Sequence, residues 1–430
     1  MGLGPSIKMT SLHHYDCPVT RRLLNDEDVD FSGVIVDGVS ENFDAKVATA
    51  VKTGEKAASL QWDGAVVAID GWGNHHVDFV NVIEQLGIRD IPAVGMSYIG
   101  LQGRLVATNQ FVDTVVDFNK ESSGYESCVV GQNNLTDMDA FKAVGILKNK
   151  VGKYGLRHTS GAGSGTDRSD GALKESLTRR YYRTDGCRIG ERTAITVDEG
   201  GRRILTLRRG LEKELLKDAP EIRDVHLRII GPDDDHDIFV NSNLDFMPVA
   251  CKASGSGDLG TGDTMQLEGL KVMLNGVEEK SGFQPANIGS SEGLLSERVK
   301  FDEAGTPASS DTILQMDFLF REGEGRTARG ICAAHDLADR LLDEVRNEMR
   351  KALGDLPADE TERFDWWSRP GKMRIGLVKI CSGLGNMYDT ALMPDEPAGY
   401  EGAYLMRDKD NEPVLLTPTQ VLDGAIHSLI

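Results

Sequence analysis

The segment IDGWGNHHVD, residues 69–78, gathers side chains that could bind a small polar molecule. It follows a short apolar run and precedes an apolar pattern at helical spacing. This order is typical of the point where a strand of an open α/β sheet ends and a helix begins. Ligands bind at such strand ends, beside helix N-termini that favour anions. We therefore predict a pocket for a substrate with a carboxylate or an amine, formed by Asp70, Trp72, Gly73, Asn74 and, at the end of the next strand, Ser97.

Histidines lie at the end of this segment and near the first cysteine of the chain. His75 and His76 belong to the segment, and His13, His14 and Cys17 occur together in SLHHYDCP. Imidazole and thiolate groups suit zinc, so these residues could build a metal site. Adjacent histidines on a strand point apart, so at most one of each pair could bind a given metal. The alternative is an ordinary strand-to-helix turn with solvent-facing histidines.

Up to residue 152 the sequence alternates between apolar runs and helical patterns. The runs 31–38, 64–71, 91–97 and 111–118 are short and apolar, which predicts buried strands. The stretches between and after them predict helices, with Ser40 as the N-cap of the first and Thr136 or Asp137 as that of the last. We predict a doubly wound, Rossmann- or flavodoxin-like α/β domain over residues 1–152.

The remaining sequence has a different pattern. A Gly- and Ser-rich stretch predicts a linker over 153–173. The basic stretch KESLTRRYYR follows, most simply a solvated helix face, although it could touch an acidic partner or the other domain. Next come strand-like runs, a hairpin turn at Glu-Gly-Gly, a long amphipathic helix over 332–353 and a last strand from residue 373. We predict an α+β domain with a mixed sheet over residues 174–430.

Charge and composition limit the partners and the location. The formal net charge of −20 over 430 residues argues against nucleic acid, because a phosphate backbone would repel such a surface. No apolar run approaches the ~18 residues that a membrane-spanning helix needs. The N-terminus lacks the pattern of a signal peptide, so we expect a cytoplasmic protein. The six cysteines occur singly, without CxxC or zinc spacing.

Longer strings resemble a known family. They include GLGPSIKMTSLHHYDCPV, DGWGNHHVDFVNV and VVDFNK in the first part, and VHLRIIGPDDDHDIFVNSNLDFMPV, IGSSEGLLSERVKFDEAGTP and VLLTPTQVLDGAIHSL in the second. The chain resembles the D-proline reductase and glycine/sarcosine/betaine reductase component B proproteins, which are pyruvoyl-type subunits. Its first part resembles the pyruvoyl-bearing part of these proteins, and its second part resembles the other part.

The resemblance implies a particular cofactor chemistry. An internal cysteine of the proprotein becomes a pyruvoyl group, the substrate amine condenses with it, and a cysteine or selenocysteine of another subunit attacks the activated carbon–nitrogen bond. This sequence differs in two ways: the two parts stand in swapped order, and none of its six cysteines occupies the processed position. A pyruvoyl group is thus expected from the family while its precursor cysteine is absent, and no other cofactor is predicted.

The resemblance also implies a function. We expect a subunit of an oligomeric reductase-like complex that cleaves a carbon–nitrogen bond of an amino acid or related amine, with a thiol- or selenol-bearing partner subunit. Cys17 is then the candidate thiol, and His14 and His76 are candidates to move protons near neutral pH. Two alternatives stay open. One is a divergent enzyme without the pyruvoyl group, including a metal-dependent one, and the other is a non-catalytic scaffold subunit.

Overall fold

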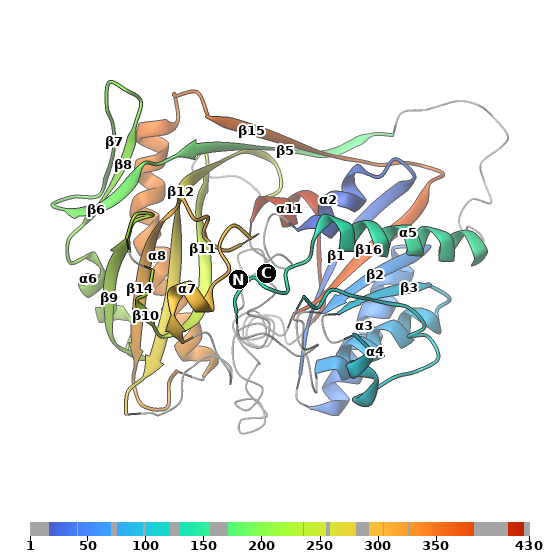
Figure 1. Cartoon of the computed structure of the whole chain (residues 1–430). Coiled ribbons are helices and arrows are strands. Elements are labelled where there is room, and N and C mark those ends of the chain that lie inside the picture. The colour runs from blue at the N-terminus through green and yellow to red at the C-terminus, as the bar shows by residue number, and fades with distance from the viewer. Residues whose placement is uncertain are drawn as a thin grey trace.

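The computed structural model describes residues 17–40, 42–69, 75–97, 100–120, 129–154, 171–234, 236–254, 259–280, 292–303, 305–325, 327–381 and 412–424. Within these ranges the fold is mixed α/β and contains two six-stranded sheets. Figure 1 shows one sheet with its helices on the right and the other on the left. Two long paired strands, β5 (Leu173–Arg183) and β15 (Glu360–Trp367), cross between them.

The first sheet has the strand order β17-β1-β16-β2-β3-β4 and is parallel except for β17. Its central strands are buried on both faces, which explains their nearly continuous apolar sequences. The strands predicted in the first 120 residues are confirmed. The bounds are β1 (Val29–Gly38), β2 (Gly64–Ile69), β3 (Ala93–Ser97), β4 (Val115–Asp117), β16 (Met373–Cys381) and β17 (Val414–Leu416).

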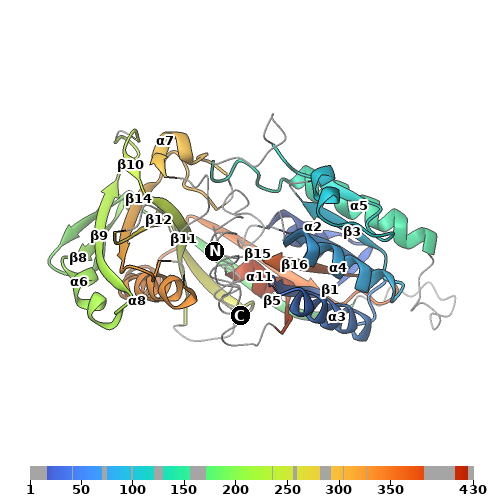
Figure 2. The same cartoon turned by 90° about the horizontal axis from the view of Figure 1, so that it is seen from below.

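Helices cover both faces of this sheet (Figure 2). α3 (Phe43–Ser59) and α4 (His76–Gly87) share one apolar core with the sheet, and the short η2 (Gly100–Leu105) follows β3. α2 (Pro18–Asn25), α5 (Asp137–Tyr154) and α11 (Pro418–Asp423) share the core of the opposite face. We name these the α3/α4 face and the α2/α5 face.

The predicted helix caps are partly right. Thr136 caps α5, because its hydroxyl accepts the N–H of Asp139 at 3.3 Å. The prediction of Ser40 as the N-cap of α3 is wrong, since Asn42 holds that position and accepts the N–H of Ala45 at 3.1 Å. Ser40 instead accepts the N–H of Asn42. Either residue type can cap a helix, so the sequence alone does not choose between neighbours.

Strand β16 lies between β1 and β2, in register along nearly its whole length. Sequence analysis expected this strand to end the sheet of the second half, and the structure corrects that placement. An apolar run shows that a strand is buried but not which sheet receives it. A boundary drawn along the sequence therefore does not separate the two sheets. Most of the predicted linker, 155–170, lies outside the described residues.

The second sheet has the order β15-β5-β12-β14-β9, with β11 also paired to β12. It mixes parallel and antiparallel pairs, as predicted. The long helix α8 (Ala328–Leu353) buries Leu337, Leu341, Val345 and Met349 in the core of this half, and that prediction is confirmed. The remaining bounds are β9 (Ile222–Ile230), β11 (Ser242–Lys252), β12 (Gly262–Glu278) and β14 (Thr312–Phe320).

Smaller elements complete the second half. β7 (Ala194–Val197) and β8 (Arg203–Arg208) form the predicted hairpin around Glu-Gly-Gly, with Gly201 in the left-handed region at φ 80°. The others are β6 (Gly186–Gly190), α6 (Leu211–Leu215), η3 (Leu216–Asp218), β10 (Phe239–Val240), β13 (Gly293–Leu294) and α7 (Leu295–Arg298). No helix of the described residues is long and apolar enough to cross a membrane.

The basic stretch KESLTRRYYR belongs to strand β5 and not to a helix, so its simplest interpretation was wrong. Alternate residues of β5 are buried, which is the period of a strand. Leu177 and Phe364, from β5 and its partner β15, pack into the core of the α2/α5 face, while Tyr182 packs into the core of the second half. The pair β5–β15 therefore connects the two cores.

Replacing Gly376 should destabilise the protein, because this glycine brings β16 against the ring of Trp62. A side-chain carbon at Gly376 would lie 2.2 Å from the indole atoms. We expect Gly376→Ala to lower the free energy of unfolding by about 1–3 kcal/mol, measured as the midpoint of urea denaturation. Gly145→Ala on α5 is the control, since no atom lies within 4 Å of its new carbon. Equal midpoints for both variants would contradict this packing.

Candidate functional site

Cys17 occupies the N-cap position of α2. Pro18 follows at the start of the helix, where its fixed φ and missing N–H are favourable. Val19, Leu23 and Leu24 are buried, so the helix packs against the sheet through one apolar face. This packing leaves Cys17 with 0% exposure at the amino end of the helix.

The surroundings of Cys17 favour the charged form of its thiol. Burial raises its pKa, but the ammonium group of Lys379 and the polar groups of Thr20 outweigh burial, so the pKa lies below its ordinary value. The amino end of a helix also favours an anion. Because the thiolate is the nucleophilic form of cysteine, this position is suited to thiol chemistry.

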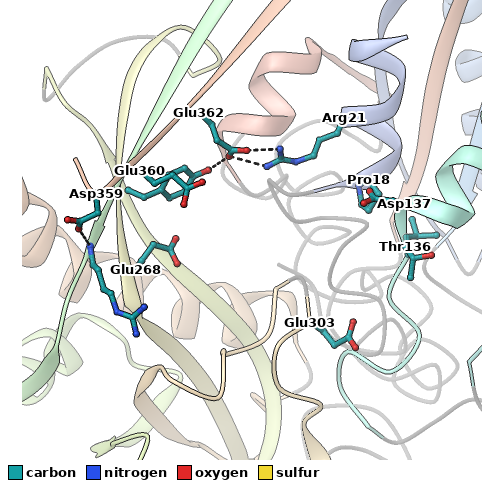
Figure 3. Close-up of a pocket in the computed structure, with 12 residues that line it drawn as sticks. Pro18, Arg21, Thr136, Asp137, Glu268, Glu303, Asp359, Glu360 and Glu362 are labelled. Carbon is teal, nitrogen blue, oxygen red and sulfur yellow. Dashed lines mark hydrogen bonds and ion pairs between the residues drawn. The ribbon is translucent and has the colours of Figure 1, made fainter. Parts of the chain in front are cut away.

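A cavity of about 850 Å³ lies between the two halves, and Pro18 forms part of its wall next to Cys17 (Figure 3). α2, the start of α5, β5, β12 and β15 contribute side chains to it. Six carboxylates and two guanidinium groups line it, so its wall carries an excess of negative charge. These are Asp137, Glu268, Glu303, Asp359, Glu360 and Glu362, with Arg21 and Arg183.

Hydrogen bonds fix one wall of the cavity. Glu362 accepts two hydrogen bonds from the guanidinium of Arg21, at 3.0 and 3.3 Å, and one from the hydroxyl of Tyr181 at 2.5 Å. These bonds connect α2, which carries Cys17, to the β5–β15 pair. Glu268 and Glu303 extend their carboxylates into the space between the halves (Figure 3). A cavity with this charge suits a ligand that carries a positive charge.

A second polar cluster is buried on the α3/α4 face. Lys46 Nζ lies 2.5 Å from Asp78 Oδ2, and the hydroxyl of Thr53 donates to Asp37 Oδ2 at 2.8 Å. Burial raises the pKa of Asp37 to about 7, opposed by Thr53 and reinforced by the charge of Asp78. Burial also raises the pKa of Asp78 to about 6, against the ammonium of Lys46. The cluster therefore takes up or releases protons near neutral pH.

His76 is buried at the start of α4. Its ring lies 5.1 Å from that of Phe79, centroid to centroid, and Gly103 approaches so closely that a side-chain carbon there would lie 2.4 Å from Cε1 of His76. Nδ1 has no hydrogen-bond partner among the described residues. Burial lowers the pKa of His76 to about 4, so the imidazole is neutral at pH 7.

The predicted site residues are placed only in part. His14, Asp70, Trp72, Gly73 and Asn74 lie outside the described residues. Ser97 is buried at the end of β3. Cys17 lies in the core of the α2/α5 face, whereas His76 packs on Phe79 of the α3/α4 face, so the sheet separates this thiol from this imidazole.

The described residues contain no group of three or more His, Cys, Asp or Glu side chains that could hold a metal ion. His13 and His14, which sequence analysis considered as metal ligands, lie outside them. His75 and His76 are both buried, and neither is the solvent-facing histidine of the ordinary-turn interpretation.

Residues 3–145 match the family model of the glycine/sarcosine/betaine reductase component B subunits. The matched segment is about a third of the chain. It contains Cys17, the buried pairs Lys46–Asp78 and Thr53–Asp37, and the strands β1 to β4.

A stretch of 257 residues, 60% of this chain, is 30% identical to the "D-proline reductase proprotein PrdA" of Acetoanaerobium sticklandii. The match covers 39% of that protein, so this chain spans about two fifths of its relative. No solved structure matches the chain. Together the two comparisons point to a subunit of the glycine/proline reductase component B type. The swapped order of the parts stays a prediction.

Sequence reasoning did not find several residues of the candidate site. Lys379 lies in the apolar run of β16, far from residue 17 in sequence. Asp37 and Lys46 are both buried, which their local sequence does not indicate. Glu362 falls in a charged stretch without a motif. An ionisable residue inside an apolar run, such as Lys379, is the one usable signal.

Asp37→Asn should flatten the pH dependence of stability. The pKa of Asp37 is about 7 in the folded protein against an ordinary 3.8, so the folded state binds more protons than the unfolded state between these values. The stability that this proton uptake contributes is present below about pH 4 and is lost as the pH rises through about 7. An uncharged amide does not lose this stability. We therefore expect the difference in free energy of unfolding, variant minus native protein, to be about 1 kcal/mol or more higher at about pH 8 than at about pH 5.

Urea denaturation at both pH values measures this difference. Asp44→Asn is the matched control, because Asp44 is an exposed carboxyl in the first turn of α3, the helix whose Thr53 donates to Asp37. The same pH dependence in Asp37→Asn and in the native protein would show that Asp37 is not the titrating group.

Proposed function

We propose that this chain is a cytoplasmic subunit of a reductase complex of the glycine/proline reductase type, and that Cys17 is its reactive thiol. The observation that carries the proposal is the position of Cys17 inside the segment that matches the component B family model, at a helix N-terminus where its pKa is lowered. A buried thiol without such surroundings has a raised pKa, as Cys251 does.

The substrate that we propose is an amino acid or related amine bound in the cavity between the halves. Its wall carries six carboxylates against two guanidinium groups, which favours an ammonium ion over an anion. Pro18 contributes to the wall and follows Cys17 directly, so a ligand there would lie close to the thiol. This site is an addition to the pocket expected around Asp70, Trp72, Gly73, Asn74 and Ser97, which we retain as a proposal.

We also propose that the first sheet is a doubly wound, Rossmann- or flavodoxin-like unit that receives β16 from the second half. Its parallel strands and the helices on both faces support this. In such a unit the carboxyl ends of the strands carry the ligand site. Cys381 and Ser97 end their strands at this edge.

The proposed reaction is the reductive cleavage of a carbon–nitrogen bond, which needs two electrons and two protons. One new C–H bond and one new N–H bond form. Cys17 and a thiol or selenol of a partner subunit supply the two electrons as they join in a disulfide or selenenyl sulfide. The protons come from the partner group and from the thiol or solvent.

The described residues fit a thiol better than a pyruvoyl group. The family resemblance implies a carbonyl made from a cysteine at the amino end of a processed chain. Cys17 is instead held within the chain by α2, Lys379 and Thr20. We therefore derive no step through a carbonyl cofactor. A divergent enzyme or a scaffold subunit remain the alternatives, and the experiments below separate them.

Cys17→Ser should abolish the reductase activity of the reconstituted complex without preventing its assembly. A serine hydroxyl is not ionised at neutral pH and cannot supply electrons. Turnover of D-proline, glycine, sarcosine and betaine with a dithiol reductant measures activity, and gel filtration measures assembly. Cys187→Ser is the control, because Cys187 lies in β6 of the second half. Full activity of Cys17→Ser in an assembled complex would favour a scaffold role.

Removing charge from the cavity should weaken binding of a cationic ligand. We expect the double substitution Glu268→Gln and Glu303→Gln to raise the Kd about tenfold for whichever of these four compounds binds, since a lost charge interaction of this size costs about 1.4 kcal/mol. Isothermal titration calorimetry measures it. Glu199→Gln, in the exposed turn after β7, is the control. An unchanged Kd would place the ligand outside this cavity.

A further inference from the structure

Lys379 is a completely buried lysine in the middle of the first sheet. Neighbouring side chains of β16 alternate between the two faces: Ile375, Leu377 and Cys381 pack in the core of the α2/α5 face, and Val378 and Ile380 in that of the α3/α4 face. By this alternation, residue 379 lies on the same face as Ile375, Leu377 and Cys381. Its side chain therefore lies on the same face of the sheet as α2 and Cys17.

The strands beside Lys379 offer apolar neighbours. Val36 of β1 and Ala68 of β2 lie in register with it, and both belong to the core of the α2/α5 face. Burial of an ammonium group in such surroundings costs several kcal/mol unless an anion or good acceptors compensate it. The ammonium group of Lys379 acts on Cys17 and lowers the pKa of its thiol, so the ionised thiol is a group that compensates this charge.

We infer that Lys379, buried on the face of the first sheet that packs against α2, is the positioning residue that activates the Cys17 thiol, so that a residue of the second half of the chain acts on the thiol of the first. The inference deepens the proposed function, on which it rests, because it explains how the reactive form of Cys17 is maintained. A thiol of ordinary acidity is only a few per cent ionised at neutral pH. A neighbouring ammonium group increases this fraction.

Other charged groups on the elements that pack against α2 are paired elsewhere. On α5, Lys148 lies 2.9 Å from Asp26 and Asp139 lies 2.9 Å from Lys120. The carboxylate of Asp423 on α11 lies 2.8 Å from Lys252, and that of Asp30 on β1 lies 3.3 Å from Arg374. Arg21 of α2 itself pairs with Glu362. In the described part of the chain, Lys379 is thus the charged side chain that acts on Cys17.

The test is the ionisation of Cys17 in the full-length chain. Ultraviolet thiolate absorbance is recorded against pH, and the spectrum of Cys17→Ser is subtracted so that the difference reports Cys17. We expect Lys379→Met, which keeps the length of the side chain and removes its charge, to move the midpoint of the Cys17 titration up by about one pH unit or more. Lys379→Arg should restore the midpoint toward that of the native chain.

Lys271→Met is the matched control, because Lys271 is a buried lysine on β12 in the second half. It should leave the titration of Cys17 unchanged. A Cys17 midpoint that is the same in Lys379→Met and in the native chain, with both folded, would overturn the inference.

A measurement on the native chain covers the case in which Lys379→Met does not fold. The infrared S–H stretch of Cys17, again taken as the difference from Cys17→Ser, should disappear at a lower pH than that of the buried Cys251, taken as the difference from Cys251→Ser, because the pKa of Cys17 is lowered and that of Cys251 is raised. An S–H band of Cys17 that persists up to the pH at which that of Cys251 disappears would refute the role of Lys379.

The outcomes also separate this inference from the proposed function. If Cys17 titrates as a thiolate that depends on Lys379 while Cys17→Ser keeps full reductase activity, the pair exists but the thiol is not the catalyst. If Cys17→Ser is inactive while Lys379→Met leaves the titration unchanged, Cys17 is the catalyst and another group activates it.

Discussion

The insertion of β16 between β1 and β2 is the constraint on which the rest of the structure depends. Both edges of this strand are hydrogen-bonded and its last seven residues are buried, so the first sheet is continuous only when the second half of the chain has returned to it. The same insertion brings Lys379 to the face on which Cys17 lies. The strand that completes the sheet of the segment matched by the component B family model therefore also carries the lysine that we propose to activate Cys17.

The two halves share more than this strand. β5 and β15 contribute Leu177 and Phe364 to the first core and Tyr182 to the second. α11 packs in the core of the α2/α5 face of the first sheet. At its end, Asp423 accepts hydrogen bonds from Lys252, Thr264 and the N–H of Gly260, which lie on or beside β11 and β12 of the second sheet. The cavity lies between these two connections, and its wall includes the Arg21–Glu362 pair. Its shape thus depends on contacts with both sheets, and a ligand there would touch residues far apart in sequence.

The sequence predicted the local elements well and the long-range placements poorly, for a physical reason. Runs such as 31–38 are apolar enough to be strands in any buried sheet, and the period of Leu337, Leu341 and Val345 is that of a helix packed on one side. Which sheet receives β16, and that KESLTRRYYR is a strand, are decided by partners far away in the chain. The candidate site follows the same rule: Cys17 was predicted from family strings close to it, whereas the role that we propose for Lys379 depends on the fold.

Buried charged groups are compensated in different ways on the two faces of the first sheet. On the α2/α5 face one ammonium group meets one thiol, so ionisation of the thiol leaves a neutral pair in an apolar core. On the α3/α4 face Lys46 pairs with Asp78, and the charge of Asp78 raises the pKa of Asp37 further, so a carboxyl there keeps its proton up to near neutral pH. Because the sheet separates these clusters, the proton equilibrium of one can change without altering the charge of the other. A thiolate and a set of protonatable carboxyls can therefore coexist at one pH, which is the condition that a reduction consuming both electrons and protons imposes.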